Sequence, residues 1–160
     1  MVLVHMVRHI LLGAVAPPLV WLAASVLPQP RWLACRTSLG QLMTNPMTSW
    51  LAATLTVIGW HIPAAFDLAQ RSALWHLIQD SSFFATGLVF WRPVVRPWPA
   101  AERLPQAAIP MYLFAATLPC DALSAFLVFC DRVVYGQHLA EHRHVSMSAL
   151  ADQQIAGAFM

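Results

Sequence analysis

The side chains in this sequence best suited to chemistry are its histidines, seven in all. His5 and His9 open the first apolar run, HMVRHILL, at a spacing that stacks two side chains on one face of a helix. His61 ends the second run, in GWHIP, and His76 opens the third. Neutral imidazole binds copper, zinc, iron and nickel. The sequence therefore offers His5, His9, His61 and His76 as candidate metal ligands.

Other polar residues are weaker candidates. His138 and His142 repeat the i, i+4 spacing beside His144, but a solvated polar loop is the simpler account of these three. Asp80 follows His76 by one helical turn and is a candidate to hydrogen-bond and orient its imidazole. For the four histidines of the apolar runs, the structural alternative is a hydrogen bond to a carbonyl or a helix end at the membrane interface.

Three methionines, Met6, Met111 and Met147, are expected near the same surface as the histidines. Thioether sulfur is a soft ligand, and soft ligands favour Cu(I). Methionine is also an ordinary apolar residue of membrane spans, so these residues add weight only together with the histidines.

Hydrolytic and nucleotide-dependent chemistry finds no support in the sequence. HExxH, GxSxG, GxGxxG and P-loop patterns do not occur, and the seven carboxylates are scattered. Cys120 and Cys130 are about 15 Å apart along a straight helix, too far for a disulfide. The sequence favours a protein that is not an enzyme.

The composition is that of a membrane protein. Hydrophobic residues make up 59% of the 160 residues and charged residues 10%, with a mean hydropathy of +0.60. Water-soluble domains carry about 25% charged residues, so this chain lacks the polar surface that water requires. Seven Trp and twelve Pro are also typical of several membrane spans. A net charge of +2 without a basic stripe argues against nucleic acid and leaves the lipid bilayer as the partner.

Four apolar runs approach or exceed the ~20 residues needed to cross a bilayer. They extend over Val2–Leu27, Met47–Ile62, Ala73–Trp91 and Ala107–Cys130. We expect the first to bend or break at Pro17-Pro18, and the second to begin at the N-cap in TNP and end near Pro63. The expected fold is all-α: a single membrane domain over residues 1–160, with about four full transmembrane spans plus a truncated final helix from Ala149.

The segments between these runs are expected to connect them. Arg31–Met43 is interpreted as an interfacial helix or loop, and residues 64–72 and 92–106 as loops. A cleaved signal peptide is the alternative for the first run, with AAS at 23–25 as the cleavage site. A retained span is favoured because further spans follow.

Arginines give the expected orientation, since the chain has no lysine. With four crossings, one side receives five arginines and the other three or four. The positive-inside rule puts the richer side in the cytoplasm, so the N-terminus is expected outside. All seven histidines then lie on the outer side, a pattern that favours a shared site. Arg8 lies among them, and it either anchors the helix at the interface or opposes metal binding.

Four stretches of this sequence resemble, in order, the signatures of the multi-span CtaG family of membrane proteins. They are HMVRHILLGAVAPPLVW, NPMTSWLAATLTVIGWHIPAAFDLA, WHLIQDSSFFATGLVFWRPV and SALADQQIAGAFM, and they span most of the chain. That family is implicated in assembly of caa-type bacterial cytochrome c oxidase and is distinct from the single-span copper chaperone that shares its name. The resemblance implies an all-helical membrane protein, usually of about seven spans, with a role in copper supply.

The resemblance also assigns residues. The matching polar residues are His5, His9, His61, His76, Asp152 and Gln153. The third motif departs from the family's His-x-x-Glu-His, because Gln79 and Asp80 stand at the last two positions. The chain begins almost at the first histidine motif and ends just after AGAFM, so a member shortened at both ends is expected.

The leading hypothesis is an assembly factor of the bacterial plasma membrane that assists copper delivery to cytochrome c oxidase subunits through an outer-face histidine site. One alternative is a membrane haem or electron-transfer protein with two histidines of facing helices as axial ligands. Another is a copper transport or resistance permease, which needs a polar path through the membrane; the sequence offers mainly Thr117 and Asp121 inside a span for it.

Overall fold

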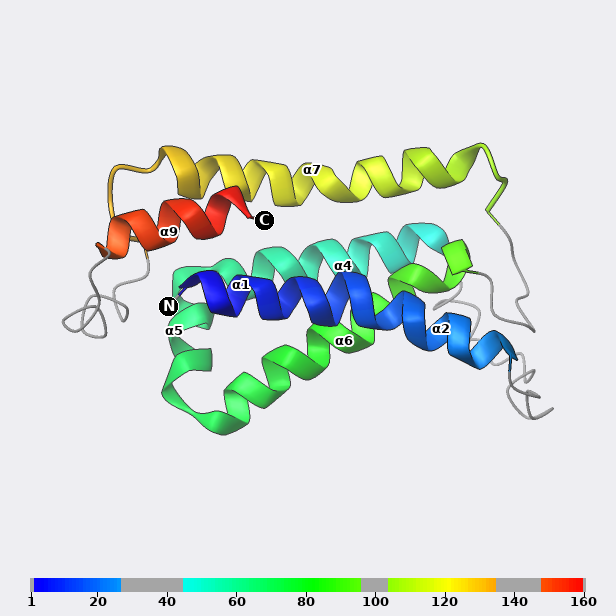
Figure 1. Cartoon of the computed structure of the whole chain (residues 1–160), viewed down its shortest axis with the longest axis horizontal. Helices are drawn as coiled ribbons and strands as arrows, with labels where there is room; N and C mark the ends of the chain where they lie inside the picture. The colour runs from blue at the N-terminus through cyan, green and yellow to red at the C-terminus, as the bar shows by residue number, and fades with distance from the viewer. Residues whose placement is uncertain (1, 27–44, 96–103, 135–147, 160) are drawn as a thin grey trace.

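The computed structural model describes residues 2–26, 45–95, 104–134 and 148–159, which form helices with no β-strand among them (Figure 1). The helices are α1 (Val2–Ile10), the π-helical η1 (Leu11–Val15), α2 (Ala16–Val26), α4 (Pro46–His61), α5 (Pro63–Arg71), α6 (Ala73–Val95), α7 (Ala108–Phe129) and α9 (Ala149–Ala158). The predicted all-α class is confirmed for this part of the chain.

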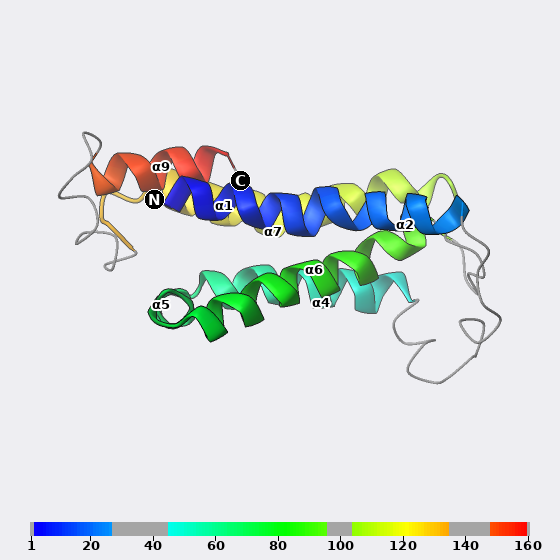
Figure 2. The ribbon, with the colours of Figure 1, turned by 60° about the horizontal axis from the view of Figure 1, so that its bottom comes forward.

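The helices pack in two layers (Figure 2). One layer contains the rod formed by α1, η1 and α2, together with α7 and α9; the other contains α4, α5 and α6. Helix α6 is the common partner, because α2, η1, α4 and α5 all pack against it. Helix α7 is held mainly by α9 and α4, and α9 in turn packs on α1.

Two helical segments are long and apolar enough to cross a membrane, Val4–Val26 and Ala108–Phe129. Helices α4 and α5 qualify only as a pair, and the pair is bent by 75°. Helix α6 has 23 residues, but polar side chains interrupt its apolar sequence, including the buried Gln79 and Asp80. Among the described residues the expected four full spans therefore become two, or three if the bent pair forms one span.

The predicted start of the second apolar run is confirmed, and two predicted loops are wrong in their bounds. Asn45 caps α4, with its side-chain oxygen 2.9 Å from the Met47 N–H, as TNP predicts. The expected loop at 64–72 is mostly helix α5, because Pro63 occupies its first turn, where a missing N–H costs nothing. The expected loop from Arg92 begins later, since α6 continues through Pro93 to Val95. Arg31–Met43 lies outside the described residues.

The prolines of the first rod do not break it; the chain forms a π-helical segment just before them. Pro17 has no N–H, so the Gly13 carbonyl loses its usual partner four residues on. The Trp91 indole N–H donates to that carbonyl from α6, at 3.2 Å. Gly13 and Gly87 allow the two helices to cross closely, because a Cβ on Gly87 would lie 2.7 Å from the Gly13 carbonyl oxygen.

Large apolar side chains cover the outer surface of both candidate spans. Leu19 is 59% exposed on α2, and Met111 and Phe114 are 77% and 66% exposed on α7. Such a surface is costly in water and suits lipid, so the fold agrees with the membrane class.

Candidate functional site

The structure brings four of the predicted ligands into one cluster. His5 and His9 lie on one face of α1, with ring centroids 4.1 Å apart. His76, from α6, stacks on His5 at 5.6 Å, and His61, at the end of α4, faces His9 at 6.2 Å. His5, His9 and His61 are all less than 8% exposed. We call these four residues the histidine cluster.

His61 has a defined proton arrangement. Its Nδ1 lies 2.7 Å from the Val57 carbonyl oxygen, which can only accept, so Nδ1 carries the proton in the neutral ring. The lone pair on Nε2 then faces the Met6 sulfur, 3.3 Å away. Neither atom has a hydrogen to donate to the other in this state. Two Lewis bases that are both metal ligands therefore face each other inside the protein.

His9 is the least satisfied member of the cluster. It is 5% exposed and its ring stacks on Phe83, with centroids 4.0 Å apart. Neither of its ring nitrogens has a hydrogen-bond partner among the described residues. Buried polar groups are normally hydrogen-bonded, so the His9 imidazole is a candidate to bind a ligand.

Arg8 forms an ion pair with Asp80, and its Nη1 lies 2.7 Å from His76 Nε2. A guanidinium can only donate, so the Nε2 lone pair of His76 is occupied by Arg8. Asp80 therefore reaches His76 through Arg8. Of the two roles considered for Arg8, this contact favours the second: it competes with a metal ion for the lone pair of His76.

The two matched polar residues of α9 are also buried. The Gln153 side chain accepts from the Val134 N–H at 2.8 Å and donates to the Arg132 carbonyl at 3.2 Å, so it fixes the chain just after α7. Asp152 is fully buried in the first turn of α9, which packs on α1. Gln153 thus has a structural role that its position in the motif did not reveal.

The sequence prediction missed two residues of the site, and three predicted histidines lie where the structure cannot test them. Gln79 is fully buried with neither amide atom partnered among the described residues; its i, i+3 spacing from His76 was the available signal. Met6 was noted for its sulfur but not placed among the candidate ligands. His138, His142 and His144 lie outside the described residues.

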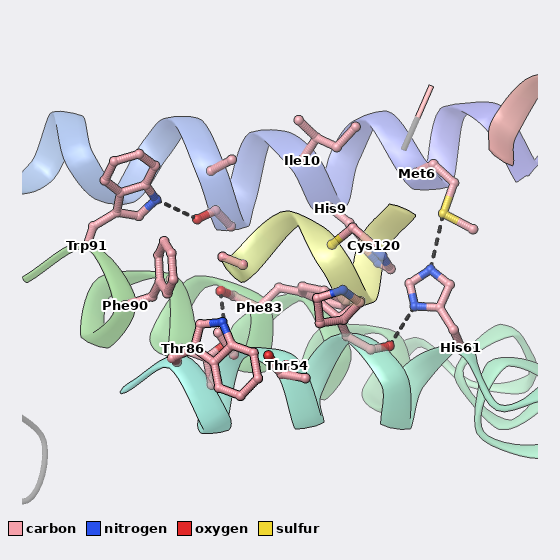
Figure 3. Close-up of a pocket in the computed structure, with 18 of the residues that line it drawn as sticks. Met6, His9, Ile10, Thr54, His61, Phe83, Thr86, Phe90, Trp91 and Cys120 are labelled. Carbon is pink, nitrogen blue, oxygen red and sulfur yellow. Dashed lines mark hydrogen bonds between the residues drawn. The ribbon is translucent and has the colours of Figure 1, made fainter. Parts of the chain in front are cut away.

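A cavity of about 380 Å³ extends from the histidine cluster along the space between the two layers. Met6 and His61 lie at one end, and Phe90 and Trp91 at the other (Figure 3). His9 lines the cavity between these two ends.

The cluster is not a preformed metal cage. Within the described ranges, no group of three or more His, Cys, Asp or Glu side chains is placed to hold a metal ion. The imidazoles meet edge-on or stacked rather than with their nitrogens converging. Among the described side chains, His61 Nε2 and Met6 Sδ are the facing pair that could hold a metal ion.

Fold and site together define a helical protein of membrane type with a buried histidine cluster beside Met6. A family model described as cytochrome c oxidase caa3 assembly factor (Caa3_CtaG) matches residues 1–160. The chain belongs to that family, as its four motifs indicate. Comparison with curated proteins and with solved structures gives no match.

Proposed function

We propose that this chain serves cytochrome c oxidase assembly by holding Cu(I) at the histidine cluster, at the outer face of the bacterial plasma membrane, and releasing it toward the oxidase subunits. Copper is here a cargo. Membership in the assembly-factor family supports the assembly role. The copper role is our inference from the side chains.

The observation that carries the proposal is the pair formed by Met6 Sδ and His61 Nε2, 3.3 Å apart. With metal bonds of about 2.0 Å to nitrogen and about 2.3 Å to sulfur, an ion bound to both atoms would have an N–metal–S angle of about 100°, close to tetrahedral. A thioether selects Cu(I) over harder ions. His9, whose ring faces His61 and whose nitrogens have no hydrogen-bond partner among the described residues, supplies a third donor.

Incomplete coordination suits a protein that passes its metal on. A closed cage would hold copper too tightly to release it, whereas two ready donors and a third that rotates into place allow exchange. Arg8 adds a restraint, because its positive charge and its contact with His76 both oppose a fourth ligand.

The test measures Cu(I) affinity of the purified full chain in detergent, under anaerobic conditions, by competition with a chromogenic Cu(I) chelator. We expect about one bound Cu(I), and at least a tenfold loss of affinity in Met6→Leu and in His61→Phe. The matched control is Met111→Leu, which removes an exposed thioether from α7 and leaves the affinity unchanged.

Equal affinities for Met6→Leu and Met111→Leu would remove the proposed pair from the site, and no binding above background would end the copper proposal. In cells, deletion of the gene should lower oxidase activity, and added copper should restore part of it. Oxidase activity in the deletion strain should be restored by the wild-type gene but not by His61→Phe, which would link the activity in cells to Cu(I) binding by the purified protein.

The two alternative functions make different predictions. A haem protein would be purified with a Soret band, which the absorption spectrum of the same sample reveals. A permease needs a polar path, but Thr117 and Asp121 are both exposed on α7 and do not line the cavity. The geometry therefore gives the permease no support within the described residues.

A further inference from the structure

We propose that the cavity between the two helix layers binds a lipid-soluble quinone, whose carbonyl oxygen accepts a hydrogen bond from His9. The proposal is independent of copper, because it concerns the apolar space beyond the histidine cluster and one nitrogen of His9. No electron transfer is invoked; the inference is a binding site.

The first observation is the shape and chemistry of the cavity. Its volume of about 380 Å³ falls in the range of ~300–1,000 Å³ that is typical of small-molecule sites. The walls are mainly aromatic and aliphatic, with rings contributed by Trp50, Phe83, Phe90 and Trp91. Aromatic walls favour a flat conjugated ring, which stacks on them, over a flexible saturated chain.

The second observation is the polar group that the cavity contains. His9 is only 5% exposed, and neither of its ring nitrogens has a hydrogen-bond partner among the described residues. A neutral imidazole offers one N–H donor and one lone pair. A quinone carbonyl satisfies the donor, and the lone pair stays available for a metal ion; a metal-bound histidine usually donates its other N–H to an oxygen in this way.

The third observation concerns access. The walls from the α1–η1 rod and from α7 belong to the two segments that are apolar and long enough to span a membrane. The α7 wall is made of the small residues Ala116, Pro119 and Cys120, and the outer face of α7 carries exposed large apolar side chains, among them Phe114 and Leu118. A ligand would therefore enter from lipid, which selects a lipid-soluble molecule.

The test titrates the purified full chain in detergent with a benzoquinone that carries a ten-carbon saturated tail. Binding is followed by quenching of tryptophan fluorescence, since Trp50 and Trp91 line the cavity. Ala116→Phe and Ala53→Phe fill the space from opposite layers. The matched control is Ala122→Phe, the same change at an exposed position of α7.

We expect saturable quenching in wild type and Ala122→Phe. We expect the dissociation constant to rise at least tenfold in whichever filling variants keep the wild-type circular dichroism spectrum, and about fivefold in His9→Phe through loss of one hydrogen bond. Equal quenching in all variants would mean partition into the micelle and would overturn the proposal. Displacement of the quinone by decanoic acid at equal concentration would also overturn it, in favour of an acyl chain.

Discussion

The rod formed by α1, η1 and α2 meets α6 in two different ways along its length. At its C-terminal half, indole donors from both elements find carbonyl acceptors: Trp91 donates to Gly13 and Trp21 to Leu88, the latter at 2.7 Å. At its N-terminal half, His9 and the Gln79 amide are buried without partners among the described residues. In the first region these buried indoles are hydrogen-bonded, whereas in the second region two buried polar side chains are left without a hydrogen-bond partner among the described residues.

The difference separates stability from function. A donor buried in a membrane without an acceptor costs free energy. A helix crossing whose indoles are hydrogen-bonded and whose glycines pack closely therefore stabilises the fold. The His9 imidazole and the Gln79 amide, buried without hydrogen-bond partners among the described residues, are the cost expected of a binding site. Substitutions in the first region should therefore change stability, and those in the second should change ligand binding.

The largest effect on stability is expected for Gly87→Ala. The new Cβ would lie 2.7 Å from both the Gly13 carbonyl oxygen and Pro17 Cγ, so the two helices must separate. We expect a loss of about 2–3 kcal/mol in unfolding free energy, seen as a lower melting temperature in detergent. Gly59→Ala is the control, because nothing lies within 4 Å of a Cβ there. Equal melting temperatures for the two variants would show that the close crossing is absent.

Trp91→Phe tests the hydrogen bond at the same crossing. The substitution keeps an aromatic ring but removes the donor to the Gly13 carbonyl, which Pro17 leaves without its helical partner. We expect a loss of about 1–2 kcal/mol. Trp75→Phe, at an indole that is 39% exposed, should change the melting temperature less. A result in the opposite order would contradict the assigned role of the indole.

For the C-terminal half of the rod, the sequence predicts the helices and the disturbance near Pro17, but not where the rod crosses α6. The helical class follows from hydropathy, and the disturbance near Pro17 follows from its missing N–H. The crossing itself depends on Gly13 and Gly87, which lie far apart in the chain and have no periodic signal. Helix α5 was missed because its short amphipathic pattern resembles a polar loop.

The histidine cluster was predicted for a different reason. The i, i+4 spacing places His5 and His9 on one face, and a common membrane side brings His61 and His76 to the same depth. What spacing does not give is orientation. The facing of Met6 and His61, and the contact of Arg8 with His76, depend on how α1 packs against α4 and α6.

Arg8→Gln changes stability and copper binding in opposite directions. Arg8 is half exposed but Asp80 is buried, so the lost ion pair destabilises the fold; the Gln amide keeps one donor for the carboxylate, and we expect a cost of about 1–2 kcal/mol. The variant also frees the Nε2 lone pair of His76 and removes a positive charge, so Cu(I) affinity should rise by about tenfold. The chelator competition and a thermal melt of the same sample measure both. Unchanged or weaker Cu(I) binding would show that Arg8 does not compete with the metal.

We expect His9→Phe to change stability least of these variants. It also distinguishes the two regions most clearly, because it should lower ligand binding without lowering stability. The imidazole makes no hydrogen bond within the described residues and already stacks on Phe83, so a phenyl ring keeps the packing and removes two unsatisfied polar atoms. The unfolding free energy should change by less than about 0.5 kcal/mol, or increase, because replacing an unpaired buried polar group with an apolar one is neutral or favourable. Cu(I) affinity should nevertheless fall. A large loss of stability would mean that His9 supports the fold, and the contrast between the two ends of the rod would then disappear.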